Sequence, residues 1–177
     1  IDVGIIAILI VFQPELRKAL EQLGKRNFFR SILIFDDSKD KNERFSDYTL
    51  DEIIRATFEL ARNKTGALIV IEEKISLNEY ENTGISLDSV ISSELLINIF
   101  ERNTPLHDGA VLLRGNRIMA ATCYLPLSDN IQLSKDLGTR HRAGIGISEV
   151  SDCLTIIVSE ETGKVSIAKE GKLIRNI

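Results

Sequence analysis

The run Ala67-Leu68-Ile69-Val70-Ile71 contains five consecutive apolar residues between Gly66 and the pair Glu72-Glu73. A continuous apolar run of this length, bounded by a turn residue and charges, indicates a strand that is covered on both faces. The segment before it, from Thr49 to about Gly66, has apolar residues at helical spacing and acidic residues in its first turn. A helix followed by a buried strand predicts an α/β fold.

The rest of the chain supplies further helices and strands for this fold. Helices are expected over residues 14–24 and 87–100, with a helix or turn over 143–148. Short strands are expected over residues 110–113, 118–124, 154–158, 165–168 and 173–175. Residues 36–47 are dense in charge and lack apolar periodicity, so a surface loop is expected there.

The composition limits the class of protein and its partners. A chain of 177 residues with 44% hydrophobic and 27% charged residues is typical of one globular domain. The net charge of -4 argues against a nucleic-acid partner, which would require a broad basic surface. Cys123 and Cys153 have no metal-binding spacing and are too few for a disulfide scaffold, so buried free thiols in the cytosol are expected.

Nearly all residues from Ile1 to Phe12 are apolar. A run of 12 residues is too short to span a bilayer, which takes about 20 residues. Two interpretations remain equally open: the end of a membrane-proximal helix, or a docking helix. We therefore separate an apolar membrane-proximal or linker segment, residues 1–13, from a globular domain, residues 14–177.

The stretch Gly138-Thr139-Arg140-His141-Arg142-Ala143-Gly144 concentrates anion-binding chemistry. Guanidinium groups donate bidentate hydrogen bonds to phosphate oxygens, and a hydroxyl and the backbone amides of a helix N-terminus add further donors. Residues two apart do not share a face of a regular helix, so convergence of Arg140 and Arg142 on one ligand predicts a turn or a first helical turn. The alternative is a solvated basic loop.

Two other polar stretches lie at strand or turn boundaries, His107-Asp108-Gly109 and Ser159-Glu160-Glu161. Together with the arginine stretch they would provide cations for a triphosphate, and carboxylate and imidazole ligands for Mg²⁺ or Mn²⁺. Glycine at position 109 would let a ligand approach the backbone closely. The alternatives are a structural histidine and a solvated acidic turn.

The stretch Phe12-Gln13-Pro14-Glu15-Leu16-Arg17 resembles the membrane-anchored class of bacterial diadenylate cyclases, and four motifs, in this order and spacing, resemble the catalytic domain of that family. They are Leu106-His107-Asp108-Gly109-Ala110, Cys123-Tyr124-Leu125-Pro126-Leu127-Ser128, Gly138-Thr139-Arg140-His141-Arg142-Ala143 and Ser159-Glu160-Glu161-Thr162-Gly163. The resemblance runs from about Pro14 to Arg175 and implies a single domain with a central mixed, twisted sheet flanked by helices. Gly144 departs from the pattern, where a second alanine is expected, and we expect it to loosen the helix that follows.

The resemblance implies that two ATP molecules are condensed into cyclic di-AMP with release of two pyrophosphates, at a face-to-face homodimer. It implies catalytic roles for Asp108, Gly109, Thr139, Arg140 and Arg142. It implies substrate contacts from Gly109, Ala110, Tyr124, Leu125, Thr139, Arg140, His141, Arg142, Ser159 and Glu160. His107, Asp108 and Glu161 would hold Mn²⁺ or Mg²⁺.

The resemblance also implies a location and partners. The domain would lie at the cytoplasmic face of the bacterial cell membrane, held by an N-terminal anchor, with a membrane regulator protein and a phosphoglucosamine mutase as partners. Two other functions compete with the cyclase. A nucleotide-sensing module would need Arg140 and Arg142 but not Asp108, and a metal-dependent phosphoesterase would need more histidine or aspartate ligands than this chain offers.

Overall fold

The computed structural model describes residues 46–131, 133–134 and 137–175. The expected helix over 14–24, the apolar segment 1–13 and nearly all of the expected loop over 36–47 lie outside the described residues. The described residues fall within one compact unit. None of the helices described for them is both long and apolar enough to cross a membrane.

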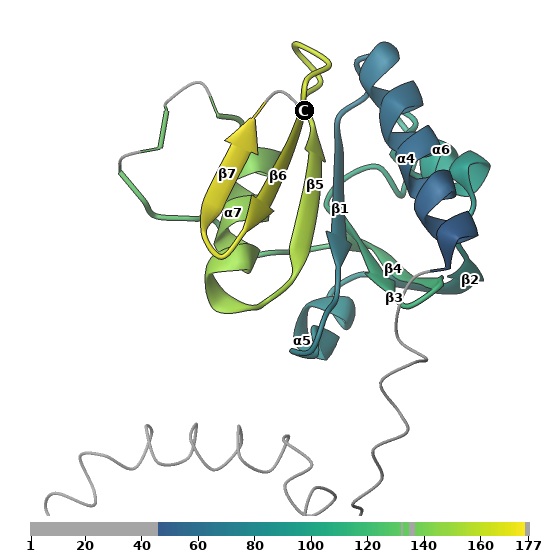
Figure 1. The fold of residues 1–177 in the computed structure, drawn as a ribbon, viewed down its shortest axis with the longest axis horizontal. Coiled ribbons are helices and arrows are strands. Elements are labelled where there is room, and N and C mark those ends of the chain that lie inside the picture. Colours follow the sequence, from purple (N-terminus) through teal and green to yellow (C-terminus); the bar gives the residue numbers. More distant parts are fainter. Residues whose placement is uncertain (1–45, 132, 135–136, 176–177) are drawn as a thin grey trace, which may run out of the picture. The chain divides into compact units, whose positions relative to one another are not determined.

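The described residues form one mixed sheet with β1 at its centre (Figure 1). Its seven strands have the spatial order β2-β4-β3-β1-β5-β6-β7. Strand β1 pairs in parallel with β3 and antiparallel with β5, which confirms the mixed sheet. The strands are β1 (Ala67–Ile71), β2 (Ile85–Val90), β3 (Ala110–Arg114), β4 (Arg117–Cys123), β5 (Leu154–Val158), β6 (Val165–Lys169) and β7 (Lys172–Arg175).

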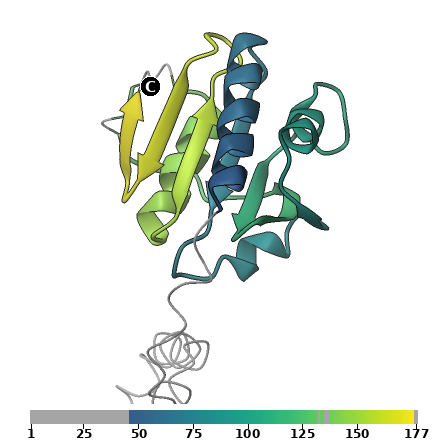
Figure 2. The same cartoon turned by 45° about the vertical axis from the view of Figure 1, so that its right-hand side comes forward.

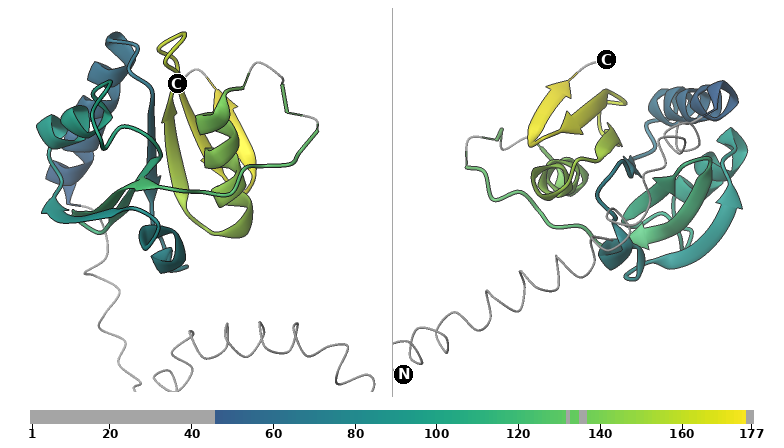
Figure 3. Two further views of the ribbon diagram at one scale, coloured as in Figure 1. Left: turned by 180° about the vertical axis from the view of Figure 1, so that it is seen from behind. Right: turned by 60° about the horizontal axis from the view of Figure 1, so that its bottom comes forward.

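Helices cover both faces of the sheet, as the apolar run of β1 predicts. Figures 2 and 3 show α4 in front of one face and α7 on the other. Side chains of β1 alternate between the two cores: Ile69 packs with α4 and α6, and Leu68 packs with α7. The helices are α4 (Asp47–Arg62), α5 (Asn78–Glu81), α6 (Ser93–Phe100) and α7 (Thr139–Val150).

The expected helix over residues 87–100 is wrong in its first half. Residues up to Val90 form strand β2, which pairs with β4, and the helix begins only at Ser93. The Ser92 side chain caps α6 by accepting a hydrogen bond from the Leu95 amide, and the buried Glu52 carboxylate accepts one from the Ser93 amide at 2.7 Å. These bonds start the helix, and the Ser93 amide is also the main cause of a lowered pKa for Glu52.

The other strand and hairpin predictions are confirmed, and so are the buried free thiols of Cys123 and Cys153. Burial raises the pKa of Cys123 to about 12 and also raises that of Cys153. Both thiols are therefore protonated at neutral pH and poor nucleophiles. Helix α7 runs from Thr139 to Val150 through Gly144, and the loosening expected from this glycine stays a prediction.

Strand directions bring the polar stretches to one edge of the sheet. Because β3 is parallel to β1, the residues before both strands lie at the same edge. Strands β4 and β5 run the other way, so the residues that follow them end there too. Asp108, Tyr124 and Ser159, far apart in sequence, therefore lie along one edge, where loops commonly carry function.

Candidate functional site

The arginine stretch forms the first turn of α7, as its spacing predicts. Gly138 is the N-cap, no side chain caps the helix there, and the first turn contains no acidic residue. The positive end of the helix dipole and the amides of this turn thus meet no capping side chain of their own. An anion is the ligand that this helix terminus favours.

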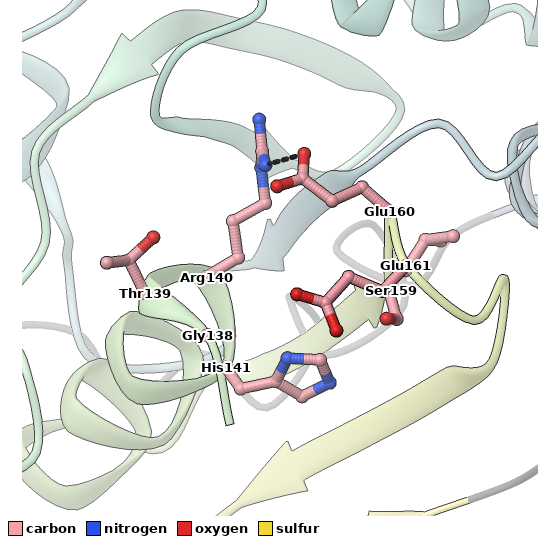
Figure 4. Close-up of a pocket in the computed structure, with 8 residues that line it drawn as sticks. Gly138, Thr139, Arg140, His141, Ser159, Glu160 and Glu161 are labelled. Carbon is pink, nitrogen blue, oxygen red and sulfur yellow. Dashed lines mark hydrogen bonds and ion pairs between the residues drawn. The ribbon is translucent and has the colours of Figure 1, made fainter. Parts of the chain in front are cut away.

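A pocket joins this turn to the end of β5 (Figure 4). Its lining residues come from two segments, 138–141 and 158–161. The pocket holds about 60 Å³, whereas small-molecule sites measure about 300–1,000 Å³. It has room for a small group such as a phosphate, and the rest of a larger ligand must lie outside it.

Arg140 is fixed at this pocket from two sides. Its Nη1 pairs with Glu160 Oε2 at 2.9 Å, and its Nη2 donates to the His107 carbonyl at 3.4 Å. Its side chain is only 21% exposed. Gly66 leaves the space for this pair, because a Cβ there would lie 2.7 Å from Nη1 and 2.9 Å from Glu160 Oε2. The arrangement presents a preoriented guanidinium to the site.

The role of Gly66 was not predicted from the sequence. From the sequence, Gly66 is expected only to end the helix before the strand, whereas α4 already ends at Arg62 with Asn63 as its C-cap. Its contact with Arg140 and Glu160 arises only when segments around positions 66, 140 and 160 meet in space.

His107 and Asp108 form a pair just before β3. The His107 Nδ1 lies 2.6 Å from the Thr104 carbonyl, so Nδ1 carries the proton and donates to that oxygen. In the neutral ring Nε2 then has a lone pair, and it faces Asp108 Oδ1 at 3.4 Å. The Asp108 side chain is 86% exposed. Two facing electron-pair donors of this kind suit a cation.

The donor set fits a metal that arrives with its substrate. No group of three or more His, Cys, Asp or Glu side chains within the described ranges could hold a metal alone, so His107, Asp108 and Glu161 do not form a complete set. Mg²⁺ is commonly bound through one or two carboxylates together with substrate phosphates. The pair His107 and Asp108 meets this requirement, and Glu161 as a ligand stays a prediction.

The backbone conformation at position 109 and its close approach to β4 require a glycine. Its φ is +101°, and a Cβ at this position would lie 2.8 Å from the Thr122 carbonyl carbon and 2.9 Å from the Cys123 oxygen. The pairing of β3 with β4 is irregular here, and Thr122 also has a positive φ of 55°. Bulges and strained residues of this kind often lie beside active sites. Whether a ligand also approaches Gly109 stays a prediction.

Gly109→Ala is therefore expected to destabilise the fold strongly. The left-handed backbone costs about 1–2 kcal/mol, and overpacking against β4 adds about 1–3 kcal/mol. Gly115→Ala is the matched control, because Gly115 also has a positive φ but nothing within 4 Å of its Cβ position. Urea denaturation measures the free energy of unfolding of both variants. Equal losses of stability in the two variants would show that the contact of Gly109 with β4 does not matter.

Some of the predicted site residues line the pocket, and others lie at the same edge without lining it. Those that line it are Thr139, Arg140, His141, Ser159, Glu160 and Glu161. Those at the same edge that do not line it are His107, Asp108, Gly109, Ala110, Tyr124, Leu125 and Arg142. Ala110 is fully buried in the core and paired with Cys123, so a substrate contact from it stays a prediction. Tyr124 is 74% exposed, and Leu125 is partly buried.

His141 is half-buried beside the pocket. Burial lowers its pKa, and the nearby Arg175 lowers it further. The folded protein therefore binds a proton at His141 less readily than the unfolded chain. The imidazole is neutral at pH 7, and it adds no positive charge to the phosphate-binding turn.

This lowered pKa predicts an acid-sensitive stability. The contribution of neutral His141 is complete above the unfolded pKa of 6.5 and is lost as the pH falls through the lower folded value. We expect the free energy of unfolding to fall less steeply below about pH 6.5 in His141→Gln than in the wild type. Urea denaturation at several pH values measures this, and identical slopes would contradict it.

Comparisons with known proteins identify the family of this chain. Residues 54–173 match the family described as DisA bacterial checkpoint controller nucleotide-binding. The chain is 54% identical over 98% of its length to the cyclic di-AMP synthase CdaA of Bacillus subtilis, and 51% identical over 98% to a diadenylate cyclase of Listeria monocytogenes. It spans 62% of the length of each of these relatives.

A solved structure shares the fold. The crystal structure of a double mutant of DacA from Staphylococcus aureus superposes with a TM-score of 0.73 at 53% identity, covering 73% of this chain and 87% of that one. By these matches, the chain belongs to the diadenylate cyclase family.

Proposed function

We propose that this chain is the catalytic part of a diadenylate cyclase and that it condenses two ATP molecules into cyclic di-AMP. The observation that carries the proposal is the pocket in which the first turn of α7 meets Ser159, Glu160 and Glu161, at the sheet edge that also carries Asp108. The names of the similar proteins support the same activity. Two pyrophosphates are the second product.

In this proposal the turn at the start of α7 binds the phosphates. Arg140 is held in place by Glu160 and the His107 carbonyl, so it meets a phosphate without losing side-chain freedom at that moment. Thr139 and Arg142 would add a hydroxyl and a second guanidinium. These donors would stabilise the charge that develops as pyrophosphate leaves.

Asp108 acts on the nucleophile, the ribose 3′-hydroxyl. The ribose 3′-hydroxyl of one ATP attacks the α-phosphorus of the other, a P–O bond to pyrophosphate breaks, and the hydroxyl proton is lost. The exposed Asp108 carboxylate would orient this hydroxyl and accept its proton. The same step, repeated in the opposite direction, closes the ring, so each protomer holds one ATP and two protomers must meet face to face.

Members of this family use a divalent metal, and here His107 and Asp108 would hold it, with Glu161 as a further ligand. When bound, Mn²⁺ or Mg²⁺ neutralises phosphate charge and orients the triphosphate. Asp108 therefore has two possible duties, as base and as ligand, and both require its carboxylate.

The adenine would lie against Tyr124 and Leu125. The exposed Tyr124 ring offers a stacking surface, and the Leu125 backbone would read the edge of the base. In this proposal the base and the triphosphate lie at one edge of the sheet.

Location and partners follow the same proposal. One similar structure is that of a hypothetical membrane spanning protein from Bacillus cereus, 43% identical to this chain with a TM-score of 0.71. We infer that an N-terminal anchor holds the domain at the cytoplasmic face of the membrane. A membrane regulator protein and a phosphoglucosamine mutase are the partners inferred with it.

Product analysis tests the proposed activity. The protein is incubated with ATP and Mn²⁺, then with ATP and Mg²⁺. The nucleotides are separated by chromatography, and their masses are determined by mass spectrometry. Cyclic di-AMP and pyrophosphate are expected. ADP or AMP with phosphate would instead identify a phosphoesterase, and intact ATP together with tight cyclic-dinucleotide binding would identify a sensor.

A further inference from the structure

We propose that Thr83 is a positioning residue for the base-binding segment of this site, which we define as residues 124–128. The inference rests on the proposed function, because it assumes that adenine binds at Tyr124 and Leu125. Thr83 lies just after α5, 41 residues before Tyr124 in the chain. It belongs to none of the four motifs that identify the family.

The Thr83 hydroxyl makes two bonds whose directions are fixed by each other. Its Oγ1 donates to the Tyr80 carbonyl at 2.6 Å and accepts the Tyr124 amide at 2.9 Å. Since the single hydroxyl proton is used on Tyr80, an oxygen lone pair is left for the Tyr124 amide. The end of α5 thus holds the backbone at Tyr124.

This bond replaces strand pairing at the point where strand pairing ends. On the β2 side of β4, from which Thr83 comes, the last pair is Ile85 with Ala121, and on the β3 side it is Ala110 with Cys123, so Tyr124 lies beyond both. Gly84, beside Thr83, lets the two segments approach, because a Cβ there would lie 2.5 Å from Cys123 Sγ. The close packing at Gly84 therefore holds Thr83 within reach of Tyr124.

The other end of the base-binding segment is fixed to α7. The Ser128 amide donates to the Arg142 carbonyl at 3.0 Å, and the Ser128 hydroxyl bonds to Glu149 at 2.6 Å. A Cβ on Gly146 would lie 2.8 Å from the Ser128 nitrogen, so the segment lies directly on the helix. Thr83 and α7 together hold the segment between them, and α7 also carries the phosphate-binding turn.

The two anchors give Thr83 a specific consequence. If its hydroxyl is removed, the segment keeps its attachment to α7 and loses its attachment at Tyr124. The position of the base contacts should then change, while the phosphate-binding turn, which has its own contacts through Arg140, should not. A residue with only a general structural role would weaken both.

Two ligands distinguish a change at the base contacts from a change at the phosphate-binding turn. Isothermal titration with Mg²⁺-ATP probes base and phosphates together, and titration with inorganic triphosphate probes the phosphates alone. In Thr83→Val we expect ATP affinity to fall about two- to tenfold, the usual effect of losing one hydrogen bond, with triphosphate affinity unchanged. Thr83→Ser keeps the hydroxyl and should restore ATP binding. Thr83→Ala replaces the valine variant if the latter does not fold.

Thr57→Val is the matched control. Its hydroxyl donates to the Ile53 carbonyl within α4, and it lines none of the pocket, so both affinities should stay at the wild-type values. Unchanged ATP affinity in Thr83→Val, equal loss of both ligands, or failure of serine to restore binding would each overturn the proposal. Because binding is measured, absence of turnover would count against the proposed activity alone.

Discussion

Asp108→Asn is expected to reduce the rate of cyclic di-AMP formation by about 10²–10⁴-fold, the usual range for loss of a general acid–base group. Asparagine keeps the size of the side chain but cannot accept the 3′-hydroxyl proton, and it is a poorer metal ligand. The fold should be unaffected, because the Asp108 side chain is 86% exposed and its Oδ1 lies 3.4 Å from His107 Nε2. Steady-state kinetics with ATP measures the effect.

The control for this variant is Asp51→Asn, which makes the same change on an exposed position of α4. Its rate should equal that of the wild type. If Asp108→Asn keeps more than about a tenth of the wild-type rate, which corresponds to about 1.4 kcal/mol of barrier, Asp108 has no central part in the reaction.

Arg140→Ala is expected to weaken ATP binding about 10- to 150-fold, because a charge-assisted hydrogen bond contributes about 1.5–3 kcal/mol. The substitution also frees the Glu160 carboxylate, which would then repel the phosphates. Arg140→Lys should fall between alanine and wild type, since an ammonium keeps the charge but not the bidentate geometry. Titration with Mg²⁺-ATP measures all three proteins.

Arg62→Ala serves as the control for charge removal. Arg62 lies in α4, is 80% exposed and pairs loosely with Glu59 at 3.8 Å, so it should leave ATP affinity unchanged. Wild-type affinity in Arg140→Ala would move phosphate binding away from the pocket.

The parts of the fold that were predicted correctly are those that short-range patterns determine. The apolar run of β1 and the turn compositions of the two hairpins do not depend on distant residues. The error over residues 87–100 has a tertiary cause. Leu87, Val90 and Ile91 have helical spacing, but pairing with β4 makes residues 85–90 a strand, and the Glu52 carboxylate from α4 helps to begin the helix at Ser93.

The candidate site divides in the same way. Thr139, Arg140 and His141 were recognisable because their chemistry is concentrated in one stretch with a glycine at its start. The roles of Gly66 and Thr83 were not, because each depends on a partner 40 or more residues away, Arg140 for Gly66 and Tyr124 for Thr83. The pairing of Glu160 with Arg140 likewise follows only from the antiparallel pairing of β5 with β1 and the position of α7.

The most direct test of the central claim is the isotope content of the product. The protein is given an equal mixture of ordinary and uniformly ¹⁵N-labelled ATP with Mn²⁺, and the cyclic dinucleotide is examined by mass spectrometry. Condensation of two ATP molecules predicts cyclic di-AMP in unlabelled, half-labelled and fully labelled forms, with the half-labelled form the most abundant and pyrophosphate released in twice the amount of the dinucleotide. ATP that stays intact, or is only hydrolysed, at a protein concentration where protomers associate would contradict the claim.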